Sequence, residues 1–347
     1  MHYHMSRLSI AALALSLGLT LALASGQAPS LRTLANERGL LMGGAISSEL
    51  FNADNPDEAA TVNREYNAVV AENAMKMRAI ANSPNPGNYL FATADAMVAS
   101  AQKNGQTVRG HTLVWHDSAP AWIYEIKEKA AMRVAMTQYI TTVVRHFGDR
   151  INIWDVVNEA ISDGPGNPLR NNNPFAVAGP DFIALAFRTA HAANPAARLY
   201  YNDYGVEGLN GKSDAMYALV KGLLEGGVPI NGVGFQAHLD TNFSVGDSGM
   251  QANLQRFRNL GLEVQLTEVD VQMVGNGSEK EKLARQAQVY GELLSTCLAV
   301  KCSAFMMWGV SDWTSWRAGG KPLIFDDGYA KKPAYGALIR VLQMAGK

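Results

Sequence analysis

Two glutamates, Glu159 and Glu268, each follow a short segment rich in β-branched and apolar residues. The first ends the segment Trp154–Glu159, and the second lies within Leu266–Asp270. Two carboxyl groups that face each other can do acid–base and nucleophilic chemistry when one is protonated and the other is charged. Cleavage of a glycosidic bond needs such a pair, because one carboxyl protonates the leaving oxygen while the other attacks the anomeric carbon or activates water. The alternative for either glutamate is a structural salt bridge or a carboxylate at a helix N-terminus.

Other polar and aromatic side chains also follow β-rich segments. Tryptophans offer flat apolar faces to sugar rings, whereas Asn, Gln, Lys and His bind hydroxyl groups in fixed directions. Three further tryptophans, at positions 122, 154 and 313, could equally pack in the core. The residues that follow β-rich segments are Glu72, Asn73, Lys76, His111, Trp115, His116, Asn158, Asn202, Asp203, Tyr204, Gln236, His238, Asp270, Trp308, Asp312 and Trp316.

Eight β-rich segments alternate with stretches of helical period, a pattern typical of parallel βα units. One helical stretch, Met132–Phe147, repeats apolar residues every three or four positions and stops at Gly148. The predicted strands are Leu40–Ile46, Tyr66–Ala71, Val108–Val114, Ile151–Asn158, Arg198–Asp203, Gly232–Ala237, Glu263–Val269 and Ala304–Val310.

This alternation predicts one α/β domain over residues 29–347, a single (β/α)8 TIM barrel. An open, doubly wound sheet is the alternative. It predicts a glycine-rich phosphate turn after the first strand, and Leu41–Ala45 lacks that spacing. Side chains at the C-terminal ends of barrel strands face the active site, so glutamates on two non-adjacent strands can meet there.

The charge balance excludes several classes of partner. The chain has 30 basic and 31 acidic residues and a formal net charge of -1, so it carries no electrostatic footprint for nucleic acid. An uncharged polymer fits this balance better. The apolar content of 48% is enough for one large folded domain. We expect neither a metal nor an organic cofactor.

The first residues, 1–28, are predicted to be a signal peptide. Arg7 precedes an apolar run, Leu8–Ala24, and small residues suited to cleavage follow it. A membrane anchor is the alternative, although the run is short for a span. We expect a secreted protein, extracellular or periplasmic, that is monomeric and has no membrane contact after the segment is removed.

The chain has two cysteines, Cys297 and Cys302. An exported chain meets oxidising conditions, so the pair predicts a small disulfide loop. Two buried free thiols are the alternative.

An ordered series of motifs resembles glycoside hydrolase family 10, the endo-β-1,4-xylanases. The resemblance covers roughly residues 35–343, which is nearly the whole predicted mature chain. Any one fragment is weak evidence, whereas the ordered series is specific. The matching motifs are Glu72-Asn73-x-x-Lys76, Gly110–His116, Asn158-Glu159, Gly234–His238, Thr267–Asp270 and Trp308–Asp312.

The resemblance implies a role for each matching residue. Glu159 corresponds to the acid/base and Glu268 to the nucleophile, with His238 and Asp270 orienting the nucleophile. Asn158 corresponds to the partner of the sugar 2-OH, and Tyr204 to a contact on the aglycone side. The glycone side is implied to be formed by Glu72, Asn73, Lys76, His111, Trp115, Gln236, Trp308 and Trp316.

Three positions depart from the family pattern. The family usually has a glutamine two residues after His116, where this chain has Ser118 preceded by Asp117. The stretch Asn171–Phe175 lacks the expected aromatic run, and Met77 stands where the family tends to have tryptophan or proline. These departures concern one glycone-side hydrogen bond, the aglycone side and local packing, respectively.

The sequence therefore predicts an endo-acting, retaining hydrolase of β-1,4-linked xylan or xylo-oligosaccharides. The first alternative is a related barrel glycosidase acting on β-1,4-glucan or mixed-linkage glucan. The second is a non-catalytic carbohydrate-binding barrel, which would have lost one of the glutamates or its partner.

Overall fold

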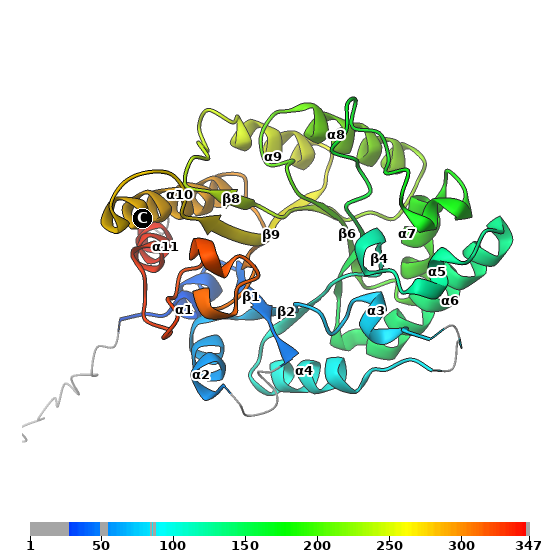
Figure 1. Cartoon of the computed structure of the whole chain (residues 1–347), viewed down its shortest axis with the longest axis horizontal. Helices are drawn as coiled ribbons and strands as arrows, with labels where there is room; N and C mark the ends of the chain where they lie inside the picture. The colour runs from blue at the N-terminus through cyan, green and yellow to red at the C-terminus, as the bar shows by residue number, and fades with distance from the viewer. Residues whose placement is uncertain (1–27, 49–54, 84, 86–87, 345–347) are drawn as a thin grey trace, which may run out of the picture.

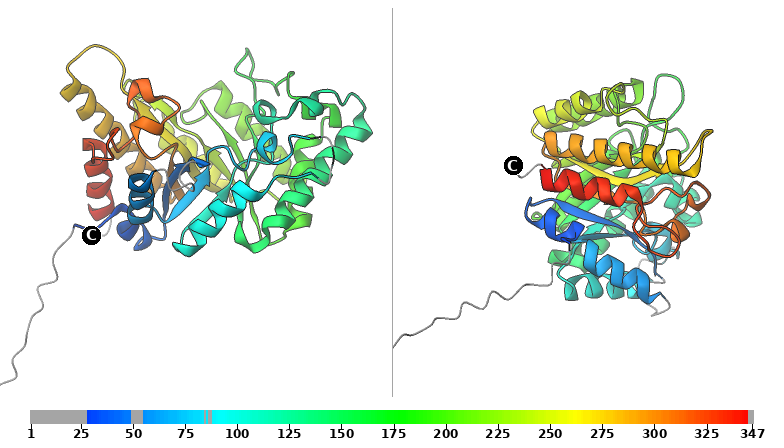
Figure 2. Two further views of the ribbon diagram at one scale, coloured as in Figure 1. Left: turned by 60° about the horizontal axis from the view of Figure 1, so that its bottom comes forward. Right: turned by 90° about the vertical axis from the view of Figure 1, so that its left-hand side faces the viewer.

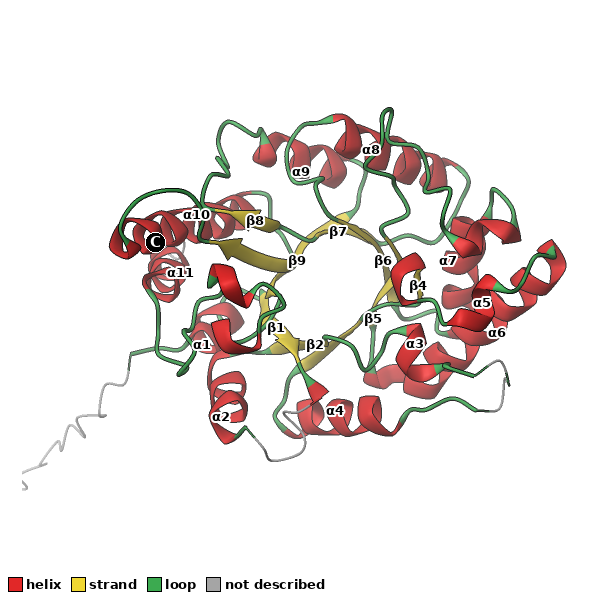
Figure 3. Ribbon diagram, viewed as in Figure 1, coloured by secondary structure: helices red, strands yellow, loops and turns green. Residues whose placement is uncertain are grey.

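The computed structural model describes residues 28–48, 55–83, 85 and 88–344, whose strands close into a barrel (Figures 1 and 3). All strand pairings in the ring are parallel, and β10 pairs with both β9 and β1, so the sheet has no free edge. The predicted (β/α)8 barrel is therefore confirmed. The ring consists of β1 (Leu41–Ile46), β2 (Ala68–Ala71), β3 (Thr107–Gly110), β5 (Ile153–Asn158), β6 (Arg198–Asp203), β7 (Gly232–Phe235), β9 (Glu263–Gln272) and β10 (Ala304–Met307).

Helices surround the ring and cover the outer faces of its strands (Figure 1). Figure 2 shows α10 and α11 running side by side on the outside of the barrel. The helices are α1 (Leu31–Asn36), α2 (Pro56–Glu65), α3 (Met77–Ile80), α4 (Ala92–Lys103), α5 (Ala121–Tyr124), α6 (Lys129–Phe147), α7 (Phe182–Ala193), α8 (Gly211–Glu225), α9 (Met250–Asn259), α10 (Glu279–Ala299) and α11 (Pro333–Met344).

Helix ends follow the local sequence. α6 stops at Gly148, whose φ of 49° lies in the left-handed region that favours glycine. α10 begins at a capping box, in which the Ser278 side chain accepts from the backbone of Glu281 and the Glu281 side chain accepts in return. These local signals fix the residue at which α6 ends and the residue at which α10 begins.

Apart from shifted strand ends, the structure differs from the prediction in one broken strand and one additional strand. The predicted segment Val108–Val114 is interrupted after Gly110 and resumes as β4 (Val114–Trp115), which pairs with β5. The interruption lets the Leu113 N–H donate to the carbonyl of Asp155. The other difference is an unpredicted short strand, β8 (His238–Asp240), which pairs with β9 after a left-handed backbone turn at Ala237.

The apolar core lies mainly between the ring and the helices. A second, smaller cluster occupies the barrel and ends at Trp308. Small residues such as Ala45 and Ala68 leave room there, because side chains from several strands share the narrow interior. The barrel is therefore filled below the cavity that its strand ends form.

The disulfide between Cys297 and Cys302 was predicted wrongly, because both cysteines are free and buried in the structure. The Cys297 thiol donates to the carbonyl of Ala304 at 3.7 Å, and burial raises its pKa well above the ordinary value. A protonated thiol is a poor nucleophile for disulfide formation. The alternative of two buried free thiols therefore holds.

The predicted signal peptide, residues 1–28, lies outside the described residues apart from Ala28. None of the helices in the described residues combines the length and the apolar composition that a membrane span needs.

Candidate active site

The C-terminal ends of the ring strands surround a cavity of about 450 Å³. A cavity of this size suits a small ligand or a few units of a polymer. Every residue to which the family resemblance gave a role lines it, except Asp270. The lining residues are Glu72, Asn73, Lys76, His111, Trp115, Asp117, Asn158, Glu159, Tyr204, Gln236, His238, Glu268, Trp308 and Trp316.

Glu159 follows β5 with a φ of 55°, a backbone conformation that non-glycine residues seldom adopt. Its Oε1 accepts from Gln236 Nε2 at 2.9 Å and from Asn158 Nδ2 at 3.0 Å. Its Oε2 accepts from Trp115 Nε1 at 2.9 Å. Burial raises the pKa of Glu159, and the negative charge of Glu268 raises it further against the opposing hydrogen bonds. This carboxyl is therefore suited to hold a proton.

Glu268 lies on β9 and is held in the opposite state. Its Oε1 accepts from Asn202 Nδ2 at 2.8 Å, and its Oε2 lies 3.1 Å from His238 Nε2. Burial alone would raise the pKa of Glu268, but the His238 hydrogen bond and the electrostatic influence of His111 hold it below the ordinary value. This carboxyl is therefore suited to be a nucleophile.

His238 connects Glu268 to Asp270, which lies behind it. The Nδ1 atom of His238 is 2.8 Å from Asp270 Oδ2. Burial would lower the pKa of His238, but the two carboxylates outweigh it and raise the pKa to about 10. The ring is thus an imidazolium at neutral pH, with a donor for each carboxylate. Asp270 also accepts from Trp316 Nε1 at 2.9 Å and from Arg317 at 2.6 Å.

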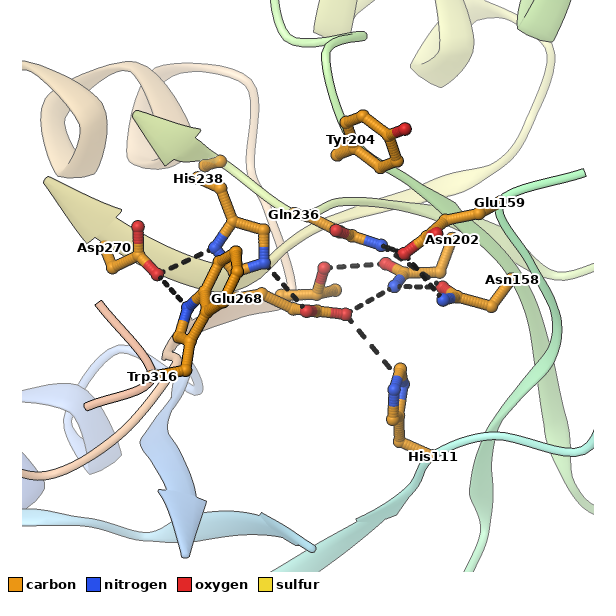
Figure 4. A network of polar contacts seen from close by, with 12 residues as sticks. His111, Asn158, Glu159, Asn202, Tyr204, Gln236, His238, Glu268, Asp270 and Trp316 are labelled. Carbon is orange, nitrogen blue, oxygen red and sulfur yellow. Dashed lines mark hydrogen bonds and ion pairs between the residues drawn. The ribbon is translucent and has the colours of Figure 1, made fainter. Parts of the chain in front are cut away.

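A chain of amide hydrogen bonds joins the two glutamates (Figure 4). Asn158 donates to Glu159, while its own Oδ1 accepts from Asn202 Nδ2 at 2.8 Å. The same Asn202 Nδ2 donates to Glu268. Asn202 is fixed in turn by Thr267, whose hydroxyl donates to Asn202 Oδ1 at 2.7 Å. The two carboxyls are therefore held over one cavity by a shared and fully buried scaffold.

His111 is oriented from below by ionic groups inside the barrel. Its Nδ1 lies 2.9 Å from Asp155 Oδ2, and Asp155 is also paired with Arg109. Arg109 Nε donates to Gln265 Oε1 at 2.9 Å. Burial would raise the pKa of Asp155, but Arg109 and His111 lower it overall. Asp155 is thus ionised and fixes the ring of His111 facing Glu268.

The side of the cavity predicted to bind the glycone combines a cation with aromatic rings. Lys76 Nζ donates to Asn73 Oδ1 at 2.8 Å and lies 5.0 Å from the ring centroid of Trp115. The Trp308 ring lies 5.9 Å from the same Nζ. Trp316 is 60% exposed and can offer an open apolar face. Flat rings beside fixed donors are what a pyranose ring requires.

Tyr204 makes no drawn contact with either glutamate (Figure 4). Its hydroxyl accepts from Arg170 at 2.7 Å and donates to Asp163, while its ring lies 3.5 Å from Lys212 Nζ. Arg170 also donates to the backbone carbonyl of Glu159 at 2.9 Å. Tyr204 is thus part of an ion cluster that braces the loop after β5.

The three departures from the family pattern have separate locations. Asp117 lines the cavity, and its carbonyl accepts from Arg78. Phe175 is buried in a short helix at 174–178, and Met77 is buried in the core.

The three tryptophans left open by the sequence also separate. Trp154 is buried in the core, and Trp313 is 67% exposed. Trp122 is half-buried, and its Nε1 donates a hydrogen bond to the carbonyl of Ala81.

The sequence did not predict which side chains support the site, chiefly Asn202, Arg317, Asp155 and Arg109. Asn202 stood among the polar residues that end predicted strands, and that position was the available signal. The contacts of the other three depend on barrel closure, which joins residues far apart in the chain.

Among the residues that the structure describes, no group of three or more His, Cys, Asp or Glu side chains is arranged to hold a metal ion. A larger cavity of about 910 Å³ lies outside the ring along α10 and α11. Its described lining includes one carboxylate, Glu292, so it offers no acid–base pair.

Comparisons with known proteins point to one family. The model of the family described as glycosyl hydrolase family 10 matches residues 30–341. The chain is 37% identical over 324 residues to endo-1,4-beta-xylanase B of Thermotoga neapolitana, covering 90% of this chain and 91% of that protein.

Two solved structures are also similar. Xylanase 10B from Thermotoga petrophila RKU-1, in complex with xylobiose, has a TM-score of 0.88 and 38% identity, covering 93% of this chain and 99% of that one. TsXylA, described as an intracellular xylanase from Thermoanaerobacterium saccharolyticum, has a TM-score of 0.83 and 37% identity, covering 90% and 98%.

Proposed function

The chain belongs to glycosyl hydrolase family 10, and from that premise we propose that it is an endo-acting, retaining β-1,4-xylanase. The single observation that supports this most strongly is the pair of buried glutamates whose pKa values are shifted in opposite directions over one cavity. Retaining glycosidases require one protonated and one ionised carboxyl at the cleavage point.

The proposed reaction has two steps. Glu268 attacks the anomeric carbon while Glu159 gives its proton to the leaving oxygen, and a covalent glycosyl-enzyme forms. Glu159 then removes a proton from water, which attacks the same carbon and releases Glu268. The charge of Glu268 is neutralised in the intermediate, so one cause of the raised pKa of Glu159 is removed. Glu159 can therefore act as an acid first and as a base second.

The surrounding side chains are proposed to bind and orient the sugar. His238, held by Asp270, keeps Glu268 ionised and correctly turned, and Asn158 binds the 2-OH beside the cleaved bond. Tyr204 serves the aglycone side. The glycone side is assigned to Glu72, Asn73, Lys76, His111, Trp115, Gln236, Trp308 and Trp316, which all border the cavity.

Xylan is the proposed substrate because similar proteins are named as xylanases and one is described in complex with xylobiose. The test is a reducing-sugar assay on xylan, cellulose and mixed-linkage glucan. We expect the highest kcat/KM on xylan. A higher value on either glucan would favour the glucanase alternative, and no release from any polymer would favour a non-catalytic binding barrel.

We further propose that residues 1–28 direct secretion and that the released enzyme is a monomer. The support for export is the apolar run Leu8–Ala24 behind Arg7. One similar protein is described as intracellular, so location needs its own test. N-terminal sequencing of protein from culture medium should begin near residue 29, and retention of the full chain in the cytoplasm would refute export.

A further inference from the structure

One stretch of three residues, Gln236–His238, touches both glutamates. Gln236 Nε2 donates to Glu159 Oε1 at 2.9 Å, and His238 Nε2 lies 3.1 Å from Glu268 Oε2. The backbone between them therefore sets how the acid/base and the nucleophile are placed relative to each other.

That backbone passes through an unusual conformation at Ala237. Its φ is 60°, in the left-handed region, and the residue is completely buried between β7 and β8. A residue with a Cβ stays in this region only where its surroundings hold it there. A buried N–H at such a turn also needs an acceptor, because it has lost its contact with water.

The side chain of Glu207 supplies that acceptor. Its Oε1 accepts from the Ala237 N–H at 2.8 Å. Glu207 is 3% exposed and lies in the loop between β6 and α8, outside the lining of the cavity. It therefore reaches the two functional side chains through the backbone and does not reach the substrate.

The loop that carries Glu207 is itself anchored. The Asn253 side chain, fully buried in α9, donates to the carbonyl of Val206 at 2.7 Å and to that of Glu207 at 2.9 Å. A continuous series of buried hydrogen bonds thus runs from α9 through Glu207 to Ala237. Such a series restrains the position of the turn from outside the barrel.

Burying a carboxyl group is unfavourable, so its presence here calls for a specific partner. Burial raises the pKa of Glu207, while the backbone N–H groups of Ala237 and of Glu207 itself oppose the rise. The charged groups that act on it are His238 and Lys212, and both lower its pKa. The carboxyl is thus held by backbone N–H groups, chiefly that of Ala237, and two cations act on its charge.

We propose that Glu207 is a positioning residue for the reaction, which fixes the left-handed turn at Ala237 and thereby aligns Gln236 with Glu159 and His238 with Glu268. This inference rests on the proposed function, because it assigns a role within the same site.

Three substitutions separate the contact from the charge. Glu207→Gln loses the charge but keeps an oxygen that can accept from Ala237, so kcat should stay within about threefold of wild type. Glu207→Asp keeps the charge but is one methylene too short, and Glu207→Ala loses both. For these two variants kcat on xylo-oligosaccharides should fall about 10- to 100-fold, because small misplacements of reacting groups are costly. KM should change less than kcat.

The pH profile distinguishes positioning from simple loss of stability. The His238 hydrogen bond lowers the pKa of Glu268, and the Gln236 hydrogen bond lowers that of Glu159. Loosening both contacts in Glu207→Asp should move both limbs of the kcat/KM profile to higher pH.

Glu65→Ala is the matched control. Glu65 is also completely buried and accepts a backbone N–H, that of Leu31 at 3.0 Å, but it lies on α2 away from the cavity. This variant should have a lower melting temperature than wild type. Its kcat and both limbs of its kcat/KM profile against pH should be unchanged.

The positioning role would be overturned if folded Glu207→Asp kept the wild-type kcat and the wild-type pH profile of kcat/KM. It would also be overturned if Glu207→Gln lost as much activity as Glu207→Ala. A wild-type chain that cleaves no xylan would instead overturn the proposed function. Should Glu207→Ala fail to fold, the comparison of Glu207→Asp with Glu207→Gln still decides the question.

Discussion

The same chemical group takes two protonation states at this site because its partners differ. Glu268 has a cationic donor, His238, whereas Glu159 has neutral donors and a negative neighbour. The motifs around the two glutamates indicated the pair, but the direction of each pKa shift depends on burial and on contacts across the barrel. These directions lead to two predictions at the residue scale.

Removal of each glutamate should have a different signature. Glu268→Ala should abolish turnover of every substrate, because no covalent intermediate can form. Glu159→Ala should slow cleavage of xylan by about 10²- to 10⁴-fold but spare aryl xylosides with good leaving groups, which need no proton. Glu263→Gln, at the start of β9, is a suitable control and should retain activity. Equal loss on both substrate types in Glu159→Ala would contradict its role as the acid.

The activity should also show two pH limbs on opposite sides of the ordinary Glu pKa of 4.5. Glu268 must be ionised, and its pKa is lowered, so activity should fall only below 4.5 as the pH drops. Glu159 must be protonated, and its pKa is raised, so activity should fall above 4.5 as the pH rises. His238, with a pKa of about 10, keeps its charge across this window.

Measurement of kcat/KM against pH tests this assignment. The limbs report the coupled pair of carboxyls, so the decisive comparison is with Glu159→Ala on an aryl xyloside. The upper limb should disappear in that variant while the lower limb remains. An unchanged upper limb would assign it to another group.

At the scale of single elements, β7 shows how a strand positions residues of its neighbours. A Cβ added to Gly234 would lie 2.1 Å from Asn202 Oδ1, whereas one added to Gly232 would lie 2.3 Å from the Tyr200 ring. Asn202 bridges the two glutamates, but Tyr200 belongs to the other end of the barrel. The same substitution therefore displaces the side chain that bridges the glutamates at one position and the packed ring of Tyr200 at the other.

We expect Gly234→Ala and Gly232→Ala each to lower the free energy of unfolding by about 1–3 kcal/mol, since both overfill a packed region. Gly234→Ala alone should also reduce kcat/KM by about tenfold or more, because it displaces Asn202. Denaturant unfolding and steady-state kinetics on both variants provide the test. Equal kcat/KM in the two variants would show that Asn202 does not hold the glutamates in place.

The ends of a strand or helix were predictable from the sequence where the element's own residues determine them. The alternation of β-rich and helical segments predicted all eight ring strands, and Gly148 predicted the end of α6. The break after Gly110 and the short strand β8 were missed, because both depend on contacts with a neighbouring strand. A period of two in the sequence carries no information about where a strand bends.

At the scale of the whole molecule, closure of the barrel brings together residues that the sequence separates. The motif series predicted the residues that line the cavity, because each motif ends a strand and all strand ends meet at one face. The supporting side chains were not predictable in this way. The supporting roles depend on contacts with other βα units, as for Asn202, Arg317 and Glu207.

The free cysteines illustrate the same limit. Their spacing and an expected oxidising environment favoured a disulfide, but the structure buries both thiols at the junction of α10 and β10. Sequence spacing sets which residues are near in the chain, whereas burial decides their reactivity.

The stereochemistry of hydrolysis tests the central claim most directly. Two carboxyls that act by double displacement should lie about 5–5.5 Å apart and retain the configuration at the anomeric carbon. A proton NMR time course on a xylo-oligosaccharide, recorded before the products mutarotate, should therefore show the β-anomer first. Early appearance of the α-anomer would contradict the covalent intermediate and the assignment of Glu268 as the nucleophile.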